Sequence, residues 1–324
     1  MKKRIRIWGL LLVLALCLVG CGGKEGPEGA QGQDSENSDP GNDDTEGNGE
    51  DDPKEDTMEQ YENQVKVMSY NIYYKDMENR AANIWDLVLK NDPDVLLLQE
   101  VSLDWVPFVQ EFLADSDYSY YGYGRYGGEM SEADLKTGEQ FVPVLWKTSK
   151  YDLVDSGHFW LSSTPEVYSA AWTDGVISNY PRCQNWVILK DKETGGELLV
   201  MPVHTDPESS AVRTNSSKLI VEKAAELAAG RPVVMGGDWN MGITEYAYEV
   251  ITDSGYRNAR FVAAVTTDKG SYNSWGSRAE DDYLLIDHIF ISENMGAASY
   301  EVLDDLYDGE HASDHCPIQA VLGY

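Results

Sequence analysis

Four short apolar runs in this chain each end at a polar residue that can bind a metal ion or transfer a proton. Each run with the residue that follows it is 65–70 with Asn71, 95–99 with Glu100, 198–203 with His204, and 232–237 with Asp238. Apolar runs of four to eight residues are typical of strands buried on both faces. In α/β sheets, functional side chains gather beyond the carboxyl ends of such strands, so the pattern predicts an active site at one sheet edge. A single polar residue after a strand usually only begins a loop, but four such endings favour a shared site.

The apolar spacing between and after these runs predicts the rest of the fold. Ile84, Leu87 and Val88 have helical spacing within 80–90, which gives a strand, helix, strand unit with the first two runs. Tyrosine and glycine clusters within 118–161 favour antiparallel strands and hairpins. The further predicted elements are strands at 141–146, 151–161, 186–189, 284–291 and 318–322, a helix at 105–112, and a helix at 218–229 that Ser209 or Thr214 could cap. Crossover units and hairpins together predict an α/β fold, a four-layer sandwich of two packed mixed β-sheets flanked by helices.

The first 21 residues have the pattern of a secretory signal. Four basic residues within 2–6 precede an apolar stretch at 7–19, which is too short for a lasting membrane span. The stretch runs into the tetrad Leu-Val-Gly-Cys, which ends at Cys21 and resembles the bacterial lipobox. This resemblance implies that Cys21 is acylated and becomes the new amino terminus, which would anchor the protein by lipid to the outer face of a bacterial cell membrane. An ordinary signal peptide with a chance cysteine is the alternative.

Residues 22–60 differ sharply in composition from the rest of the chain. They carry 14 acidic and 2 basic side chains and almost no apolar ones. Such a segment cannot bury enough apolar surface to offset the loss of chain entropy, so we predict a disordered, self-repelling tether. Residues 61–324 are then expected to form one catalytic domain.

The chain is strongly acidic, with 25 Lys and Arg against 56 Asp and Glu and a net charge of −31. Within 61–324 the balance is 19 basic to 42 acidic side chains. Such a domain repels polyanions at long range, so duplex nucleic acid is disfavoured as a partner. A bound divalent cation would reverse the sign of the charge locally, so the balance weakens the case for a nuclease without excluding one.

Cysteine usage leaves the redox state of the domain open. Once Cys17 is removed with the signal and Cys21 carries lipid, Cys183 and Cys316 remain. An oxidising exterior would permit a disulfide between them, and two free thiols are the equal alternative.

Two motifs resemble those of a known family. Gly-Asp-Trp-Asn at 237–240 follows a buried strand and Ser-Asp-His at 313–315 lies near the terminus, as in the endonuclease/exonuclease/phosphatase superfamily of deoxyribonuclease-I-like metal-dependent phosphoesterases. The resemblance spans roughly 64–322. Its motifs recur in the family's order at Asn71, Gln99 with Glu100, Glu139, His204, Asp238 with Asn240, Asp287, and Asp314 with His315. Pro202 and Val203 precede His204 where the family often has Asn and Thr, so the resemblance does not fix the hydrogen bonding of His204.

The resemblance, together with the chemistry of phosphoesters, implies a metal site. Hydrolysis needs a hard cation to neutralise developing negative charge, and Mg²⁺ or Mn²⁺ prefers carboxylates, waters and substrate oxygens. Glu100 is the expected first ligand. Asn71 and, through the family pattern, Asp314 are expected to complete or orient the site.

The resemblance also implies the catalytic roles. His315 is expected to pair with Asp287 and His204 with Glu139, which would fix the tautomer of each imidazole. Asp238 is expected to orient or deprotonate the attacking water, and Asn240 to donate to a phosphate oxygen.

The combined prediction is a metal-dependent phosphoester hydrolase on the outer face of a bacterial membrane. A small or membrane-derived phosphodiester is favoured as its substrate over nucleic acid. The alternatives are a secreted nuclease of the same superfamily and a non-catalytic surface lipoprotein that binds a ligand. Arg182 and Arg213 could clamp a phosphate, with a surface ion pair as the default interpretation.

Overall fold

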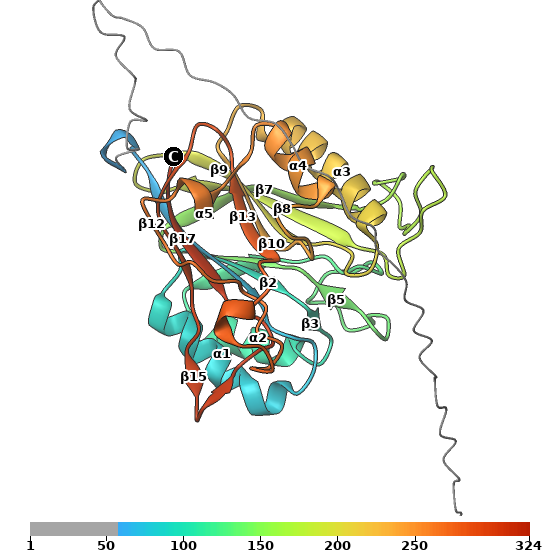
Figure 1. Ribbon diagram of the computed structural model, residues 1–324, viewed down its shortest axis with the longest axis horizontal. Helices are drawn as coiled ribbons and strands as arrows, with labels where there is room; N and C mark the ends of the chain where they lie inside the picture. The colour runs from blue at the N-terminus through green and yellow to red at the C-terminus, as the bar shows by residue number, and fades with distance from the viewer. Residues whose placement is uncertain (1–57) are drawn as a thin grey trace, which may run out of the picture. The chain divides into compact units, whose positions relative to one another are not determined.

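The computed structural model describes residues 58–324 (Figure 1). The predicted signal sequence with Cys21, and the predicted tether up to residue 57, lie outside the described residues. The last three residues of that tether, Met58–Gln60, form a short 3-10 helix, η1. Within 58–324 no helix is both long and apolar enough to cross a membrane.

The first of two large sheets has seven strands and contains both parallel and antiparallel pairs. In spatial order its strands are β12 (Val265–Thr266), β14 (Gly296–Val302), β17 (Ile318–Gly323), β1 (Gln64–Asn71), β2 (Val95–Gln99), β6 (Val144–Lys147) and β4 (Tyr118–Tyr121). The parallel pair β1 and β2 is joined by helix α1 (Met77–Asn91), as the strand, helix, strand pattern predicted. Parallel neighbours require such a crossover, whereas hairpins can join antiparallel ones.

The second sheet has six strands and is also mixed. Its strands in spatial order are β11 (Arg257–Asn258), β13 (Asp287–Ile291), β10 (Val233–Asp238), β9 (Glu197–His204), β8 (Cys183–Asp191) and β7 (Tyr151–Trp160). Helix α3 (Ser210–Ala228) joins the parallel strands β9 and β10. The remaining short elements are β3 (Val101–Ser102) paired with β5 (Gln140–Phe141), β15 (Leu306–Tyr307) paired with β16 (Glu310–His311), and the 3-10 helix η2 (Glu280–Asp282).

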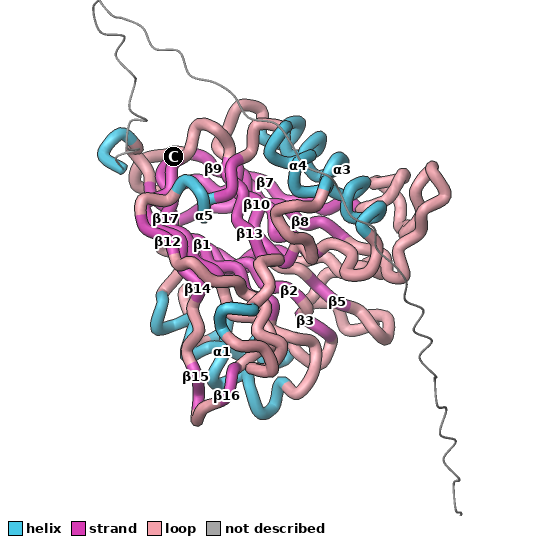
Figure 2. Tube along the Cα trace, in the orientation of Figure 1, coloured by secondary structure: helices cyan, strands magenta, loops and turns pink. Residues whose placement is uncertain are grey.

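The two sheets pack face to face, and helices cover their outer faces, as Figures 1 and 2 show. Helices α1 and α2 (Val106–Ala114) lie on the first sheet, and α3 and α4 (Tyr246–Asp253) lie on the second. A one-turn helix, α5 (Ala259–Val262), packs near β13 and β14. The predicted four-layer α/β sandwich is therefore confirmed.

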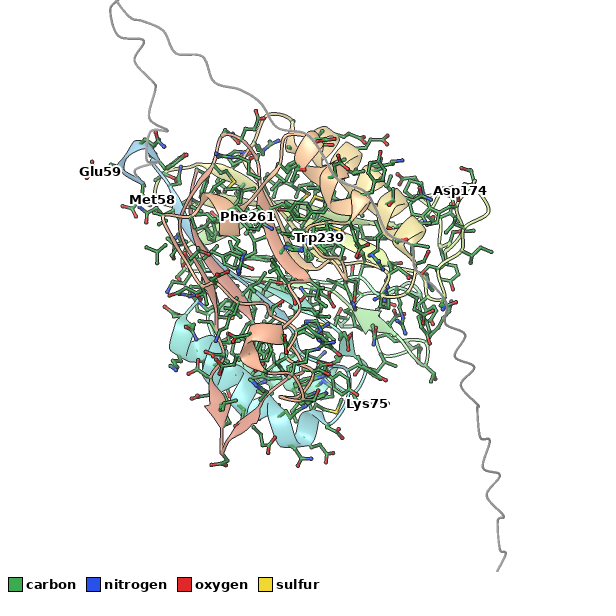
Figure 3. All side chains as sticks on the ribbon, in the orientation of Figure 1. Met58, Glu59, Lys75, Asp174, Trp239 and Phe261 are labelled. Atoms are coloured by element: carbon green, nitrogen blue, oxygen red, sulfur yellow. The ribbon has the colours of Figure 1, made fainter. Side chains whose placement is uncertain are left out.

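Both faces of the central strands are buried, which explains why they are continuously apolar. In β2, Leu97 faces the core between the sheets, while Leu96 and Leu98 face α1 and α2 on the other side. On the far face of the second sheet, Trp239 is fully buried and meets Phe290 edge to face at 5.1 Å (Figure 3). Strands buried on two faces need apolar side chains at every position, not at alternate ones.

Several element boundaries differ from the sequence expectations. The predicted strand 141–146 is split into β5 and β6, because Pro143 lacks the N–H that a continuous ladder requires. The predicted helix 218–229 begins earlier, at Ser210, and Ser209 caps it by accepting from the N–H of Val212 at 3.3 Å. The predicted strand 284–291 begins only at Asp287.

Candidate active site

The register of the strands brings the predicted site residues together. Parallel β1 and β2 pair Asn71 with the residue before Glu100, so both side chains leave the same edge of the first sheet. In the second sheet, β9 and β10 pair His204 with Asp238, and β13 begins with Asp287 opposite Asp238. The carboxyl ends of four parallel strands in two sheets thus meet at one rim, as the apolar runs predicted.

Asp238 lies at the centre of this rim and is buried. One carboxylate oxygen accepts from the backbone N–H of Asn240 at 2.9 Å, and the other from the side-chain amide of Asn71 at 3.0 Å. The latter oxygen also lies 3.6 Å from Nε2 of His204 and 3.8 Å from Nε2 of His315. Burial raises the pKa of Asp238 to about 7, which makes its carboxylate a stronger base than an exposed one.

Close approach of the backbones helps to build this rim. At Gly237, the residue before Asp238, an added Cβ would lie only 1.9 Å from the carbonyl oxygen of Val203 in β9. The glycine of the Gly-Asp-Trp-Asn motif is therefore required by packing between β9 and β10. Asn240, the last residue of the motif, has φ 50°, a left-handed conformation that asparagine tolerates better than most residues.

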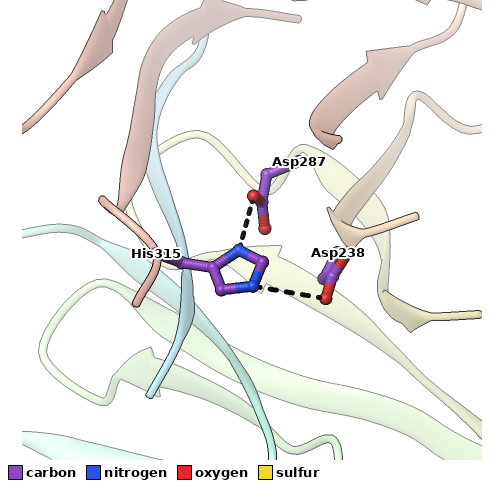
Figure 4. A group of neighbouring side chains, drawn as sticks. All are labelled: Asp238, Asp287 and His315. Carbon is purple, nitrogen blue, oxygen red and sulfur yellow. Dashed lines mark hydrogen bonds and ion pairs between the residues drawn. The ribbon is translucent and has the colours of Figure 1, made fainter. Parts of the chain in front are cut away.

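His315 is clamped between two carboxylates (Figure 4). Its Nδ1 donates to Asp287 Oδ2 at 2.8 Å, and its Nε2 faces Asp238. The hydroxyl of Ser271 donates to the same oxygen of Asp287 at 2.5 Å and fixes it in place. Burial alone would lower the pKa of His315, but the charges of Asp287 and Asp238 outweigh burial and raise it to about 10. His315 is therefore an imidazolium at neutral pH.

Asp238, Asp287 and His315 are also close enough to hold a metal ion, since one ligand atom from each lies within 4.8 Å of the others. The contact geometry favours a proton instead. A hydrogen bond of 2.8 Å joins Nδ1 of His315 to Asp287, so a proton occupies the position that a metal ion on that nitrogen would take. We interpret the three side chains as an ion-paired relay.

His204 has a different environment from the one that the resemblance implied. Nη1 of Arg182 donates to its Nδ1 at 3.0 Å, so Nδ1 is an acceptor and the ring proton resides on Nε2. Burial, and next the charge of Arg182, hold the pKa of His204 well below its usual range. Nε2 faces Asp238 and, at 4.0 Å, Glu100. His204 is thus a neutral imidazole that presents an N–H to the rim.

The predicted pairing of His204 with Glu139 is therefore wrong. Glu139 is buried, but its carboxylate accepts from the backbone N–H groups of Tyr126 at 2.9 Å and Gln140 at 3.2 Å. These bonds tie together the loop between β4 and β5. Arg182, placed just before β8, occupies the position beside Nδ1 that an orienting carboxylate would otherwise take.

A hollow of about 580 Å³ opens at this rim. Its walls include three of the five predicted carboxylates and both predicted histidines, together with the Asn240 side chain; these residues are Glu100, Asp238, Asp314, His204, His315 and Asn240. Arg125 and Arg182 line the same hollow. The structure thus gathers most of the predicted site residues around one cavity. Three of them do not line it: Asp287 bonds to His315 from behind, Asn71 bonds to Asp238 and Glu100, and Glu139 lies in the adjacent loop.

Comparison with known proteins decides the family. The sequence profile of the Endonuclease/Exonuclease/phosphatase family matches residues 68–315. The chain belongs to this family. A solved endonuclease/exonuclease/phosphatase family protein from Bacteroides thetaiotaomicron is 28% identical, with a TM-score of 0.73 over 81% of this chain and 98% of that one. The mannosyl-6-phosphatase of Bacteroides thetaiotaomicron VPI-5482 is 28% identical, with a TM-score of 0.71 over 80% of this chain and 100% of that one.

Curated relatives match only part of their own length. An uncharacterized protein of Acanthamoeba polyphaga mimivirus is 25% identical over 210 residues, which are 56% of this chain and 30% of that protein. A second relative, Protein angel of Drosophila melanogaster, is matched over 52% of its length. Both alignments are therefore confined to a part of a longer protein.

Members of the endonuclease/exonuclease/phosphatase family are hydrolases of phosphoester bonds and generally use a divalent metal ion. Glu100 and Asp314 supply the donor set that such an ion prefers. Asp314 is half-buried, and its carboxylate accepts a 3.4 Å hydrogen bond from the hydroxyl of Ser313. Burial and the nearby charge of Glu100 raise the pKa of Asp314, so the pair fits a cation.

Asn71 is more constrained than expected for a metal ligand of this family. Its amide nitrogen donates to Asp238 and, at 3.3 Å, to Glu100. Its amide oxygen accepts from the N–H of Tyr73 at 3.1 Å, which leaves one lone pair of that oxygen. Asn71 orients the two carboxylates, and its own role as a ligand remains a prediction.

Glu100 reaches the rim through an unusual backbone conformation. It has φ 62°, in the left-handed region that only a few per cent of non-glycine residues adopt. The turn directs its carboxylate toward the N–H of Tyr74, which donates at 3.1 Å. Strained conformations of this kind persist where the surrounding structure holds them, and they cluster at functional sites.

Several residues at the family's site were not identified from sequence, or were identified incorrectly. Arg125 and Ser271 lie in loops and carry no motif of their own, so no periodic pattern marks them. Of the two arginines that could clamp a phosphate, Arg182 lines the hollow, whereas Arg213 forms an ion pair with Glu245 at 2.7 Å, the default interpretation. Among the cysteines of the described chain, Cys183 and Cys316 are both buried free thiols, so the disulfide alternative is excluded here.

Proposed function

We propose that this protein is a divalent-cation-dependent phosphoester hydrolase that acts on a small phosphorylated molecule. One observation carries the proposal: Glu100, Asp238 and Asp314, with two histidines of opposite charge state, line a single hollow of about 580 Å³. Carboxylates, a neutral imidazole and an imidazolium at one point provide a base, a donor and a fixed positive charge.

The chain's own groups divide the work of the reaction. Asp238 takes a proton from the attacking water. Burial raises its pKa, which makes its carboxylate a suitable base. His315 is already protonated, so it cannot also serve as a base; it neutralises the charge on Asp238 and on the phosphoryl oxygens. Nε2–H of His204 and the side-chain amide of Asn240 donate to phosphate oxygens.

Glu100 and Asp314 would hold the divalent ion, which supplies Lewis-acid stabilisation of the charge that develops on the phosphoryl group. Mg²⁺ is the expected ion and Mn²⁺ the alternative, because oxygen ligands suit both. The charge of Glu100 beside the carboxylate of Asp314 in the wall of the same hollow supports a requirement for such an ion.

Two classes of small phosphoester are candidates. The sequence favoured a phosphodiester, on the basis of the ordered set of motifs and of the negative charge that disfavours nucleic acid. The 28% identity with a mannosyl-6-phosphatase over 100% of that chain favours a phosphomonoester instead. In both cases the acidic domain argues against a nuclease.

The proposal predicts a defined ranking of substrates. With Mg²⁺ or Mn²⁺ present, small phosphoesters should be hydrolysed with a kcat/KM at least about tenfold above that for single-stranded or duplex DNA at physiological salt, because the acidic surface repels polyanions. Rates would be measured by phosphate or chromophore release, with a chelated sample as the control. Degradation of DNA in preference to every small ester would make the secreted nuclease the better reading. A tight ligand complex without turnover would favour the non-catalytic lipoprotein.

We also propose that the enzyme is displayed on a lipid anchor at Cys21, which rests on the sequence of residues 1–21 alone. Replacing Cys21 with alanine should remove the acyl group and block cleavage before residue 21, because the cysteine is both the acylated residue and the new amino terminus. Fractionation of cells that express the full chain, with mass spectrometry of the amino-terminal peptide, would measure this. An unmodified Cys21 in the wild type, or a variant that is cleaved before residue 21 as the wild type is, would contradict the proposal.

A further inference from the structure

Two guanidinium groups in the wall of the active-site hollow lack the counterions that buried arginines normally have. Arg125 and Arg182 both line the hollow, and Arg182 is only 8% exposed. Within residues 58–324, neither forms an ion pair with a carboxylate at 4.0 Å or less. Burial, and next the charge of Arg125, lower the pKa of Arg182, so the two cations repel each other.

Arg182 has unused donors that point to a missing partner. The Nη1 of Arg182 donates to Nδ1 of His204, whereas its buried Nε has no hydrogen-bond partner in the described chain. A buried donor without an acceptor costs about 1–3 kcal/mol, and such groups are rare unless a ligand or water satisfies them. A small space bounded by Arg125, Arg182 and His204 adjoins the hollow on this side.

Arg125 is held rigidly at the other side of this position. Its Nε and Nη2 donate to the carbonyl oxygen of Gly138, and its Nη1 donates to Gln140 at 2.9 Å. The rings of Tyr126 and Tyr180 lie over the guanidinium at 5.1 Å and 4.8 Å. These contacts use three of its five N–H groups and fix its plane, so the remaining donors are preorganised.

We infer that Arg125 and Arg182 bind the second negative charge of a phosphomonoester and make the enzyme selective for monoesters over diesters. The inference rests on the proposed phosphoesterase function. A diester carries one charge, whereas a monoester carries nearly two at neutral pH and has three non-bridging oxygens. Two guanidinium groups without counterions complement the additional charge and oxygen, since arginine forks match phosphate oxygens. A diester would fill this position with a neutral ester group and leave both cations uncompensated.

The test compares two esters with the same leaving group, p-nitrophenyl phosphate and bis(p-nitrophenyl) phosphate. In the wild type, kcat/KM should be higher for the monoester. Arg125→Gln should lower kcat/KM for the monoester about 10- to 100-fold, as expected for loss of a charged hydrogen bond, and lower that for the diester less than about threefold. Arg182→Gln should lower both rates, because Arg182 also holds Nδ1 of His204, so the comparison of the two esters is made with Arg125→Gln. Arg231→Gln is the matched control, because Arg231 pairs with Glu197 away from the hollow and should change neither rate.

A binding measurement keeps the inference separate from the proposed function. Inorganic phosphate should raise the Tm of the wild type, and this increase should be largely lost in Arg125→Gln, which is the safer variant because Arg125 is less buried than Arg182. Equal losses for both esters, a wild type that prefers the diester, or an unchanged phosphate effect in Arg125→Gln would overturn the inference while phosphoesterase activity stood. If no ester were hydrolysed with metal present, the proposed function would fail, and the phosphate-dependent Tm would still decide whether the arginines form an anion site.

Discussion

Replacing Glu100 with glutamine is expected to lower kcat/KM for phosphoester hydrolysis by about a thousandfold or more, since a metal ion contributes several kcal/mol of charge stabilisation. Glutamine has the same size and keeps one oxygen that can accept from Tyr74, but it lacks the negative charge that attracts a cation. The variant would lose the partly exposed carboxylate of Glu100, which the left-handed backbone turn at this residue directs toward the hollow.

The measurement is a titration of activity with Mg²⁺ and with Mn²⁺, for the wild type and the variant. The metal concentration that gives half-maximal activity should rise markedly in Glu100→Gln, and chelation should abolish activity in the wild type. Glu245→Gln is a suitable control, because Glu245 has a similarly exposed side chain (30% against 20%) but pairs with Arg213. A Glu100→Gln enzyme with wild-type rate and unchanged metal requirement would show that the metal proposal is wrong.

The sequence allowed the fold and the centre of the site to be predicted because both depend on local patterns. An apolar run buried on two faces predicts a central strand, and the polar residue at its end predicts where the chain reaches the sheet edge. Asn71, Glu100, His204 and Asp238 lie where these patterns placed them. His315 and Asp287 also pair as the resemblance implied.

The parts that could not be predicted depend on contacts between loops. Arg182 reaches His204 from a position just before β8, and nothing in the residues around it distinguishes it from Arg213, which forms an ion pair instead. The carboxylate of Glu139 satisfies backbone N–H groups in its own loop, an outcome that depends on the loop conformation. Hydrogen-bond partners of this kind are set by tertiary geometry, so sequence spacing does not report them.

The charge states of the two histidines show how the same environment produces opposite effects. Both imidazoles are buried, and burial disfavours the charged form of each. His204 has a guanidinium beside Nδ1 and stays neutral, whereas His315 has a carboxylate at each nitrogen and becomes charged. One residue type thus supplies a neutral donor and a fixed cation a few ångströms apart, because its neighbours differ.

Replacing Asp238 with asparagine is expected to lower kcat by about 10²- to 10⁴-fold, the range that a positioned general base contributes. Asparagine is nearly isosteric, so one oxygen can still accept from the N–H of Asn240. The amide nitrogen would then face the donor amide of Asn71, and the variant would lack any group to take the proton of water. Loss of a buried carboxylate also removes a charge next to His315, whose pKa should fall.

The pH dependence of this variant separates a catalytic role for Asp238 from a structural one. Burial raises the pKa of Asp238 to about 7, so wild-type activity should fall as the pH drops through neutrality and the base becomes protonated. This fall is the acid limb of the pH–rate profile, and a bound cation would move it to lower pH. Because the pKa of Asp238 is raised, the folded state binds more protons than the unfolded state between the ordinary carboxylate pKa and about 7. The stability that Asp238 contributes therefore declines as the pH rises through that window. Removing the charge should therefore leave the Tm at pH 8 unchanged or higher, while the acid limb disappears from the residual activity. A large fall in Tm would indicate a structural role for Asp238. Residual activity that still falls with pH in the same range would assign the proton transfer to another group.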